Sequence, residues 1–336
     1  MKQVIQKRPS TMSEFDLIAS LQRIICLPAD IVEAGCRVGI GDDSAVLEVP
    51  PGHELIVCTD TLVEGVHFPS GTRPEAIGHK ALAVNLSDLA AMGARPTFFF
   101  LALTLPAADP AWLEAFSRGM ASLARQSRIQ LAGGDTTSGP LSVTITAMGV
   151  VDKGRALLRS GARPGDKIVV SGIPGAAARA LQLIKNEEAP DPPDRAALEF
   201  PVPRLGLGQA LLGKATACID LSDGLAADLG HVLHQSGAGA LIELDRLPRS
   251  NSLEALPDEA RWPLQLAGGD DYELCFTVSP SVVPDLPAIA NSCGVELAVV
   301  GTVVRQPGLK FARADGSLFG LASSGYEHFS GQENST

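Results

Sequence analysis

Apolar and polar positions repeat along the chain with two different periods, and these predict alternating helices and strands. Apolar side chains spaced three and four residues apart are typical of one helix face, as at Leu17, Leu21 and Ile24. Shorter runs of β-branched and aromatic residues, bounded by glycine or proline, predict strands. In the first half the predicted helices are residues 13–25, 74–94 and 110–127, and the predicted strands are 54–60, 96–106 and two within 129–151 separated by a Gly-rich turn.

The second half opens with a joint rich in glycine and proline. Residues 159–184 then predict a strand, a turn and a helix. Residues 185–204 hold too much proline and charge for a strand or a long regular helix, so we expect a surface excursion there. A chain of 336 residues exceeds the usual size of one hydrophobic core. We therefore expect an α+β protein with two domains, residues 1–155 and 156–330.

The pentapeptide Leu-Ala-Gly-Gly-Asp occurs once in each predicted domain, at residues 131–135 and 266–270. Duplication of one ancestral domain would explain the pair. Five shared residues, most of them small, are also compatible with coincidence. Both interpretations stay open on the sequence alone.

Composition and charge narrow the class of protein. Hydrophobic residues make up 45% of the chain and charged residues 19%, as in ordinary globular proteins. The net charge of -11 argues against nucleic acid or an anionic membrane as the main partner. The N-terminus lacks the apolar core of a signal peptide, and the densest apolar run, residues 97–105, is too short to cross a bilayer. We expect a cytoplasmic location.

The cysteines show no Cys-x-x-Cys spacing, and several lie inside apolar runs. Buried, reduced thiols are the favoured interpretation, and a zinc site or a disulfide framework is the alternative. The six cysteines are Cys26, Cys36, Cys58, Cys218, Cys275 and Cys293.

Residues 208–216, GQALLGKAT, come close to a phosphate-binding P-loop but lack two of its requirements. Ala215 stands where the magnesium-binding hydroxyl belongs, and no strand precedes the first glycine. The intervening residues favour a helix. No Gly-x-Gly-x-x-Gly follows a predicted strand either, so a Rossmann site is not expected.

Aspartates gather at predicted strand ends, beside glycines and on a helix of small residues. Each one alone is compatible with a turn or a helix cap. Together they suggest a site where hard divalent cations offset the repulsion among carboxylates, because magnesium takes a few carboxylate ligands and fills its shell with water and phosphate oxygens. The set is Asp42, Asp43, Asp60, Asp88, Asp135, Asp220 and Asp223.

An ordered series of motifs covers nearly the whole chain. It comprises GIGDDSAV, CTDTLVEGVHF, KALAVNLSDLAAMGA, LAGGDTTSGPLSVTITAMG, RSGARPGD, IDLSDGLAADL, GGDDYELCFTV and SGYEHF. In this order the motifs resemble the thiamine-monophosphate kinase family, which shares a superfamily with aminoimidazole ribonucleotide synthetase and selenophosphate synthetase. The resemblance implies two α+β domains, the first binding ATP and magnesium and the second completing the active site. It also implies a homodimer in which the N-terminal sheets of two subunits close a barrel.

The resemblance further implies roles for individual residues. Magnesium ligands, several ions in all, would be Asp43, Cys58, Thr59, Asp60, Asp88, Asp135, Asp220 and Asp223. ATP would contact Gly134, Asp135, Arg159 and Ser222; the substrate would contact His67, Asp270 and Ser323; Arg159 and Asp223 would be catalytic.

Three positions depart from the family pattern. Cys58 stands where relatives can have serine, and a backbone carbonyl could serve there equally. Asp270 replaces an expected glutamate, and Ser323 replaces a frequent tryptophan.

Two of the predicted site residues have alternative structural roles. His67 is also compatible with a buried histidine bonded to backbone, and Arg159 with a salt bridge at the domain joint.

The implied activity is direct, in-line phosphoryl transfer from ATP to thiamine monophosphate. An anionic phosphate oxygen is already a nucleophile, so charge neutralisation matters more than a general base. One alternative is a sibling ATP-dependent synthetase, although the N-terminal residues before Phe15 contain neither the cysteine nor the glycine that selenide chemistry would use. The other alternative is a nucleotide or magnesium sensor without turnover, which the residues at 270 and 323 keep open.

Overall fold

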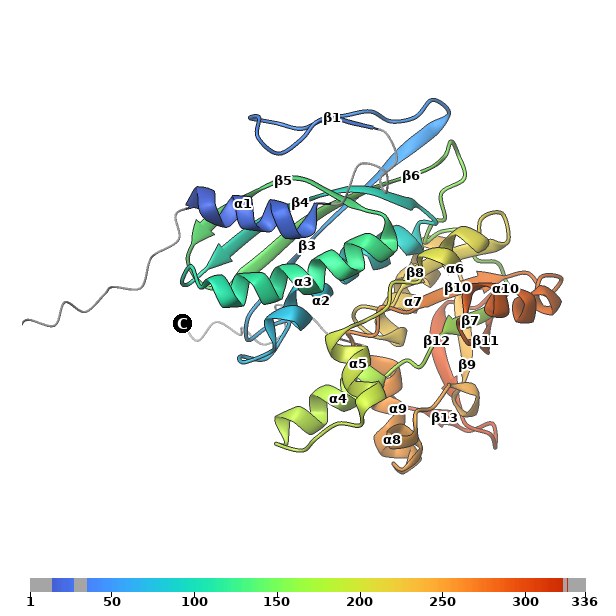
Figure 1. Cartoon of the computed structure of the whole chain (residues 1–336). Coiled ribbons are helices and arrows are strands. Elements are labelled where there is room, and N and C mark those ends of the chain that lie inside the picture. Colours follow the sequence, from blue (N-terminus) through green and yellow to red (C-terminus); the bar gives the residue numbers. More distant parts are fainter. Residues whose placement is uncertain (1–13, 27–34, 323–324, 326–336) are drawn as a thin grey trace, which may run out of the picture. The chain divides into compact units, whose positions relative to one another are not determined.

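The computed structural model describes residues 14–26, 35–322 and 325 of the chain (Figure 1). Two compact units divide it. The first comprises Met1–Glu48, Thr59–Leu82 and Thr97–Thr146, and the second comprises Val49–Cys58, Ala83–Pro96 and Ala147–Thr336. The domain boundary that we expect near residue 155 stays a prediction.

A four-stranded sheet has the order β3-β6-β4-β5. β4 and β5 are parallel, with Phe98 opposite Gln130 and Leu105 opposite Ser138. A short antiparallel pair, β1 and β2, precedes this sheet in the chain. The bounds are β1 Cys36–Val38, β2 Val46–Leu47, β3 His53–Val63, β4 Arg95–Leu105, β5 Gln130–Ser138 and β6 Ser142–Asp152.

Three helices confirm the helical periods of the first half. They are α1 (Glu14–Ile25), α2 (Pro74–Ala91) and α3 (Pro110–Ser127). The α1 residues Leu17 and Leu21 are buried, as the spacing predicts. α1 packs against α3 and β5. Asp109 caps α3 by accepting the N–H of Ala111 at 2.9 Å.

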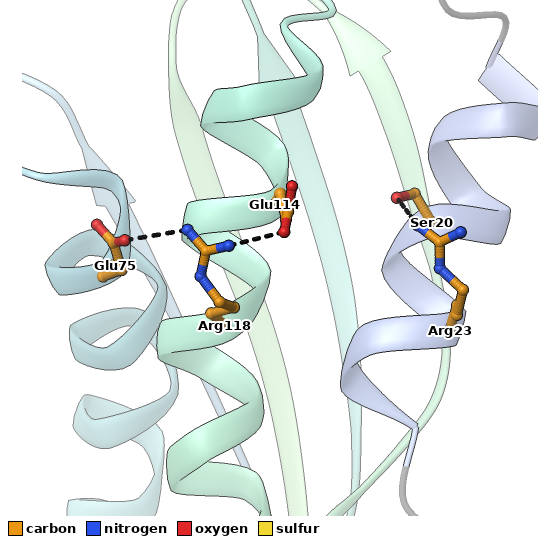
Figure 2. A network of polar contacts seen from close by, with 5 residues as sticks. All are labelled: Ser20, Arg23, Glu75, Glu114 and Arg118. Atoms are coloured by element: carbon orange, nitrogen blue, oxygen red, sulfur yellow. Dashed lines mark hydrogen bonds and ion pairs between the residues drawn. The ribbon is translucent and has the colours of Figure 1, made fainter.

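Two glycines let α2 and α3 approach closely. A Cβ at Gly78 would lie 2.1 Å from the carbonyl oxygen of Phe116, and one at Gly119 would lie 2.0 Å from that of Glu75. Near this crossing Arg118 of α3 forms ion pairs with Glu114 at 2.7 Å and with Glu75 of α2 at 3.4 Å (Figure 2). Backbone contact and an exposed ion pair therefore fix this helix pair together.

Two predicted strand boundaries are wrong, and both bear on aspartates. β3 continues to Val63, so Asp60 lies inside the strand and not at its end. β5 runs through Gly133 and Gly134 to Ser138, so Asp135 lies in a strand and not in a turn. The hydroxyls of Thr59 and Thr61 pair with those of Thr146 and Thr144 in β6, so β3 continues past Asp60. In β5 the register shifts between the partners of Phe99 and Phe100, next to Gly133.

The second unit contains a seven-stranded sheet with the order β13-β12-β9-β11-β7-β10-β8. β12 and β9 are parallel, whereas the pairs β13–β12, β9–β11, β11–β7, β7–β10 and β10–β8 are antiparallel. The bounds are β7 Lys167–Ser171, β8 Ala215–Asp220, β9 Gly239–Glu243, β10 Leu274–Val278, β11 Leu297–Val304, β12 Gly308–Ala312 and β13 Leu318–Phe319.

Both faces of this sheet are buried. In β7, Ile168 and Val170 join the core that contains Trp262, whereas Val169 joins the core that contains Phe276. Successive strand residues point to opposite faces, so one strand serves both cores. Cys218 and Cys275 are buried within these cores, which confirms the predicted buried thiols in part, because the other four cysteines are only half-buried; none of the six forms a disulfide.

Helices of the second unit modify two predictions. The helix expected in place of a P-loop at residues 208–216 is confirmed in part, because α6 ends at Ala210, residues 211–214 form a turn and β8 begins at Ala215. The predicted surface excursion is wrong in part, because it contains α5, which packs against α4 and buries Leu198. The bounds are α4 Ala176–Lys185, α5 Pro192–Glu199, α6 Leu205–Ala210, α7 Leu225–Ser236, α8 Asn251–Glu254, α9 Asp258–Ala267 and α10 Leu286–Cys293, with short 3-10 helices Leu244–Arg246 and Val283–Asp285.

The two Leu-Ala-Gly-Gly-Asp segments adopt different structures. Residues 131–135 lie inside strand β5, whereas residues 266–270 leave the end of helix α9 and enter a loop. The difference favours coincidence over duplication. Across the described ranges of the chain, no helix has both the length and the apolar character needed to span a membrane.

Candidate functional site

In the first unit, Asp43 and Asp135 are exposed. Asp43 follows Gly41, whose φ of 117° makes the turn, and its N–H donates to Oδ1 of Asp42 at 2.9 Å. Asp135 occupies β5 directly after Gly134, where a Cβ would lie 1.9 Å from the carbonyl oxygen of Leu101. Only glycine fits there, because β4 comes close to β5 at this position.

The predicted ligands in β3 lie on opposite faces of the strand. The Thr59 hydroxyl shares a hydrogen bond with that of Thr146 at 2.9 Å, on the exposed face. Cys58 points the other way, and its Sγ donates to the carbonyl oxygen of Asn85 at 3.3 Å. Strand alternation places the half-buried Asp60 on the same face as Cys58. The three residues therefore cannot all direct side chains to one point.

His67 lies in the turn that follows β3. Its Nδ1 accepts the N–H of Val63 at 3.0 Å, so the neutral ring carries its proton on Nε2. Lys80 donates to the carbonyl oxygen of His67 at 3.3 Å. The hydrogen bond to Nδ1 fixes the orientation of the imidazole ring.

In the second unit, Asp220 ends β8 and is only 5% exposed. Its Oδ2 accepts a hydrogen bond from the buried hydroxyl of Ser87 at 2.8 Å. Ser87 directly precedes the half-buried Asp88 on α2. The structure therefore brings two predicted magnesium ligands, Asp88 and Asp220, into neighbouring positions.

The loop after β8 carries Ser222 and Asp223, and a single carboxylate oxygen holds its backbone. Oδ2 of Asp228, in the first turn of α7, accepts the N–H groups of Ser222, Asp223 and Gly224 at 3.0, 3.1 and 3.1 Å. Burial and the nearby charge of Asp220 raise the pKa of Asp228 to about 7, although the N–H donors act in the opposite direction. The buried carboxyl of Asp228 thus holds the backbone of this acidic loop.

A second loop, residues 268–273, lies against this one. The N–H of Asp270 donates to the carbonyl oxygen of Ser222 at 2.9 Å, and that of Tyr272 donates to Leu221 at 2.8 Å. Asp270 and Tyr272 have φ values of 70° and 50°, and the Tyr272 hydroxyl donates to Oδ1 of Asp270 at 3.0 Å. Strand β10 begins only at Leu274, so Asp270 and Tyr272 both lie before it.

Between these two residues, Asp271 is buried. Its Oδ2 accepts the N–H of Gly175 at the start of α4 at 2.8 Å, and its Oδ1 has no hydrogen-bond partner. Burial raises the pKa of Asp271 well above the usual aspartate range, and the charge of Glu273 raises it further. Burial therefore disfavours the charged form of this carboxyl.

An ion pair between the half-buried Arg204 and the buried Glu273 anchors the end of the second loop. Nε of Arg204 donates to Oε2 of Glu273 at 2.6 Å, and Nη2 donates to Oε1. The hydroxyl of Ser171 donates to Oε2 as well and accepts the N–H of Leu274 at 2.9 Å. Two parallel donors from one guanidinium fix the orientation of the carboxylate.

The two remaining predicted site residues are Arg159 and Ser323. Arg159 is exposed, and the carbonyl oxygen of its neighbour Leu158 accepts the N–H of Cys218 in β8 at 2.9 Å. Ser323 lies outside the described residues.

The sequence interpretation did not single out Asp228, Arg204 or Asp271. An aspartate in the first turn of a helix was a usable signal for Asp228, because negative charge is favourable there. Arg204 gave no signal, since its partner Glu273 is 69 residues away in the sequence.

Apart from Cys58, the predicted metal ligands offer carboxylate and hydroxyl oxygens, and these donors suit a hard cation. Within the described part of the chain, no three His, Cys, Asp or Glu side chains form a group that could hold a metal ion. Magnesium does not require such a group, because it keeps several waters and binds phosphate oxygens of its substrates. The donor chemistry therefore fits magnesium bound together with a phosphate ligand.

Comparison with known proteins identifies two domains that together match most of the chain. Residues 41–151 match the AIR synthase related protein, N-terminal domain, and residues 163–313 match its C-terminal domain. This assigns a mixed α/β, two-domain fold of the AIR synthase related type.

Individual relatives match nearly the full chain. Thiamine-monophosphate kinase of Salmonella typhimurium is 44% identical over 94% of this chain and 98% of that protein. The crystal structure of thiamine-monophosphate kinase from Stenotrophomonas maltophilia K279a is 43% identical, with a TM-score of 0.83 over 92% of this chain and 98% of that chain. The structure of AaThiL complexed with AMPPCP and TMP is 28% identical, with a TM-score of 0.73 over 97% of this chain and 100% of that chain. The chain belongs to the thiamine-monophosphate kinase family.

Proposed function

We propose that this chain transfers the γ-phosphoryl group of ATP to thiamine monophosphate and so forms thiamine diphosphate. The observation that carries the proposal is the 44% identity to the Salmonella typhimurium kinase over nearly the full length of both chains. The AaThiL structure, which holds the ATP analogue AMPPCP and TMP together, supports the same pair of substrates.

The chemistry requires alignment of two anionic groups more than it requires a base. The attacking atom is an anionic phosphate oxygen, so proton removal contributes little. We assign the exposed cation Arg159 to the transferring phosphoryl group, where it would offset negative charge. Ser222 and the backbone beside Gly134 and Asp135 would orient the ATP phosphates. No phosphoenzyme is needed, because the acceptor attacks directly.

Several magnesium ions would neutralise the phosphate charge when bound. Asp223 has its backbone already fixed by Asp228, and Asp220 is fixed by Ser87. Thr59 shares its hydroxyl with Thr146. Cys58 and Thr59 therefore fit better as carbonyl donors than as side-chain donors. The proposed ligands are Asp43, Cys58, Thr59, Asp60, Asp88, Asp135, Asp220 and Asp223.

The acceptor would contact His67, Asp270 and Ser323. His67 has a fixed ring that can donate from Nε2. Asp270 offers a carboxylate, oriented by Tyr272, to the cationic thiazolium ring.

The two predicted domains would divide the work of the site. Residues 1–155 would bind ATP and magnesium, and residues 156–330 would complete the site. The cytoplasmic location stays a prediction.

The homodimeric barrel remains part of this proposal. β3 is an edge strand of its sheet, and Leu55 and Val57 on it are 43% and 50% exposed. Edge strands with exposed apolar side chains favour pairing with another chain. Val57→Lys should shift the molar mass from dimer to monomer in light scattering, whereas Val202→Lys, at an exposed loop residue, should leave it unchanged. An unchanged mass for Val57→Lys would contradict the barrel.

The function is tested by ADP release against a panel of phosphorylated vitamins and nucleotides. Thiamine monophosphate alone should stimulate release strongly and yield thiamine diphosphate. Equal stimulation by free thiamine or by aminoimidazole precursors would contradict the proposed activity, and the second result would favour a sibling synthetase. Binding of ATP without acceptor-dependent turnover would identify a sensor.

A further inference from the structure

Asp228 occupies an unusual place beside the proposed nucleotide site. It is 3% exposed, and one of its oxygens receives three successive backbone N–H groups from the loop that carries Ser222 and Asp223. Helix α7 has no side-chain cap at its N-cap residue Gly224. The carboxylate of Asp228, in the first turn of α7, therefore caps the N-terminal end of this helix.

The same loop is held from its other side by residues 269–273. The carbonyl oxygens of Leu221 and Ser222 accept N–H groups from that segment at 2.8 and 2.9 Å. Gly224 has a φ of 112°, and a Cβ there would lie 2.9 Å from the carbonyl carbon of Ala267. Backbone contacts on one side and Asp228 on the other thus hold the loop in place.

We propose that Asp228 is a positioning residue for the metal-bound nucleotide, acting through the backbone of Ser222 and Asp223. It touches neither ATP nor metal in this proposal. Its oxygen sets the direction of the Ser222 and Asp223 side chains, which are half-buried and belong to the proposed ATP and magnesium contacts. The inference rests on the proposed function for those two roles.

Shape and charge at residue 228 can be separated by two substitutions. Asp228→Asn keeps an acceptor oxygen at the same place without the charge, so affinity for AMPPCP should stay within about twofold of wild type. Asp228→Glu keeps the carboxyl group but displaces the oxygen by one methylene, so the affinity for AMPPCP and for Mn²⁺ should each fall by about tenfold or more. Calorimetry measures the first affinity, and electron paramagnetic resonance of Mn²⁺ measures the second.

Steady-state kinetics give an independent readout. Asp228→Glu should raise the KM for ATP and the magnesium concentration for half-maximal rate, while the KM for thiamine monophosphate changes by less than about twofold. Asp194 supplies the matched control: it is 1% exposed, lies in the same unit and accepts hydrogen bonds from Ser250 and Ser252. Asp194→Glu should lower the melting temperature without changing AMPPCP affinity.

Three outcomes would overturn the proposal. They are wild-type AMPPCP affinity in Asp228→Glu, a loss in Asp228→Asn as large as that in Asp228→Glu, and an equal loss in Asp194→Glu. The binding measurements do not require turnover. A wild-type protein that binds AMPPCP but makes no thiamine diphosphate would thus refute the proposed function while still testing Asp228.

Discussion

Acidic residues of the two units differ in what surrounds them. In the first unit Asp43 and Asp135 are exposed, and the Arg118–Glu75 pair is 55% and 40% exposed in its side chains. In the second unit Asp220, Asp228, Asp271 and Glu273 are buried, and each has a hydrogen-bond donor from another residue. Buried carboxylates are costly unless such donors are present. Folding thus fixes the geometry of these four acids in the second unit, whereas solvent still reaches Asp43 and Asp135 in the first.

The largest expected effect concerns Asp88, next to the Ser87 that holds Asp220. Asp88→Asn keeps the side-chain shape but removes the charge, so kcat should fall by about a thousandfold or more while the fold persists. ADP release and circular dichroism measure the two properties. Asp152→Asn, an exposed control beside His53, should keep full activity. Substantial activity of Asp88→Asn at saturating magnesium would show that Asp88 is not a ligand.

The second effect contrasts a buried ion pair with an exposed one. Arg204→Met leaves Glu273 buried without its main partner and should lower the free energy of unfolding by about 3–5 kcal/mol. Arg118→Met removes the exposed pair and should cost less than about 1 kcal/mol. Urea denaturation measures both. Similar losses in the two variants would mean that burial does not distinguish the units.

A smaller, pH-dependent effect is expected at Asp271. Its raised pKa means that the folded state keeps a proton that the unfolded chain releases near pH 4, so its contribution to stability falls as pH rises above that value. Asp271→Asn is neutral at every pH and keeps an acceptor for Gly175. It should raise the melting temperature by about 2–5 °C at pH 8 and by less at pH 5.

The contrast with an exposed acid checks this interpretation. Asp315 is exposed, and hydrogen bonds from Ser317 lower its pKa. Asp315→Asn should therefore give no gain at pH 8. A gain for Asp271→Asn that is the same at both pH values would show that titration of Asp271 is not its cause.

The smallest effect concerns the acceptor end of the site. An aromatic face beside a cationic thiazolium ring contributes about 1 kcal/mol, so Asp270→Glu with Ser323→Trp should lower the KM for thiamine monophosphate by about fivefold. The KM for ATP should stay nearly constant. An unchanged acceptor KM would indicate that another aromatic residue already fills this role.

Periodicity predicted most of the regular elements. Helix α3 spans the predicted residues, and the buried Leu17 and Leu21 follow from spacing alone. Strand ends were predicted less well, because cross-strand partners decide them: Asp60 lies inside β3 where Thr59 and Thr61 pair with β6.

Some residues of the candidate site could likewise be predicted from the sequence, and others could not. The motifs pointed to Asp220 and Asp223, since aspartates beside glycine and small residues are visible in the sequence. Burial is not visible there, so the contribution of Asp228 and the contact of Arg204 with Glu273 needed the structure. The left-handed backbone at Asp270 and Tyr272 also gave no signal, because neither position holds glycine.

The strand order of the second unit also determines when that unit can fold. β7 lies between β11 and β10, and both of these strands follow it in the chain only after helices α4 to α9. β12 and β13 are the one pair among its described strands that are neighbours in both sequence and sheet. Pairings between distant segments form slowly, because the intervening chain must first be closed into a loop. During synthesis β7 therefore leaves the ribosome without its neighbours, and its apolar residues stay without a sheet until β10, the first of the two to follow, has been made.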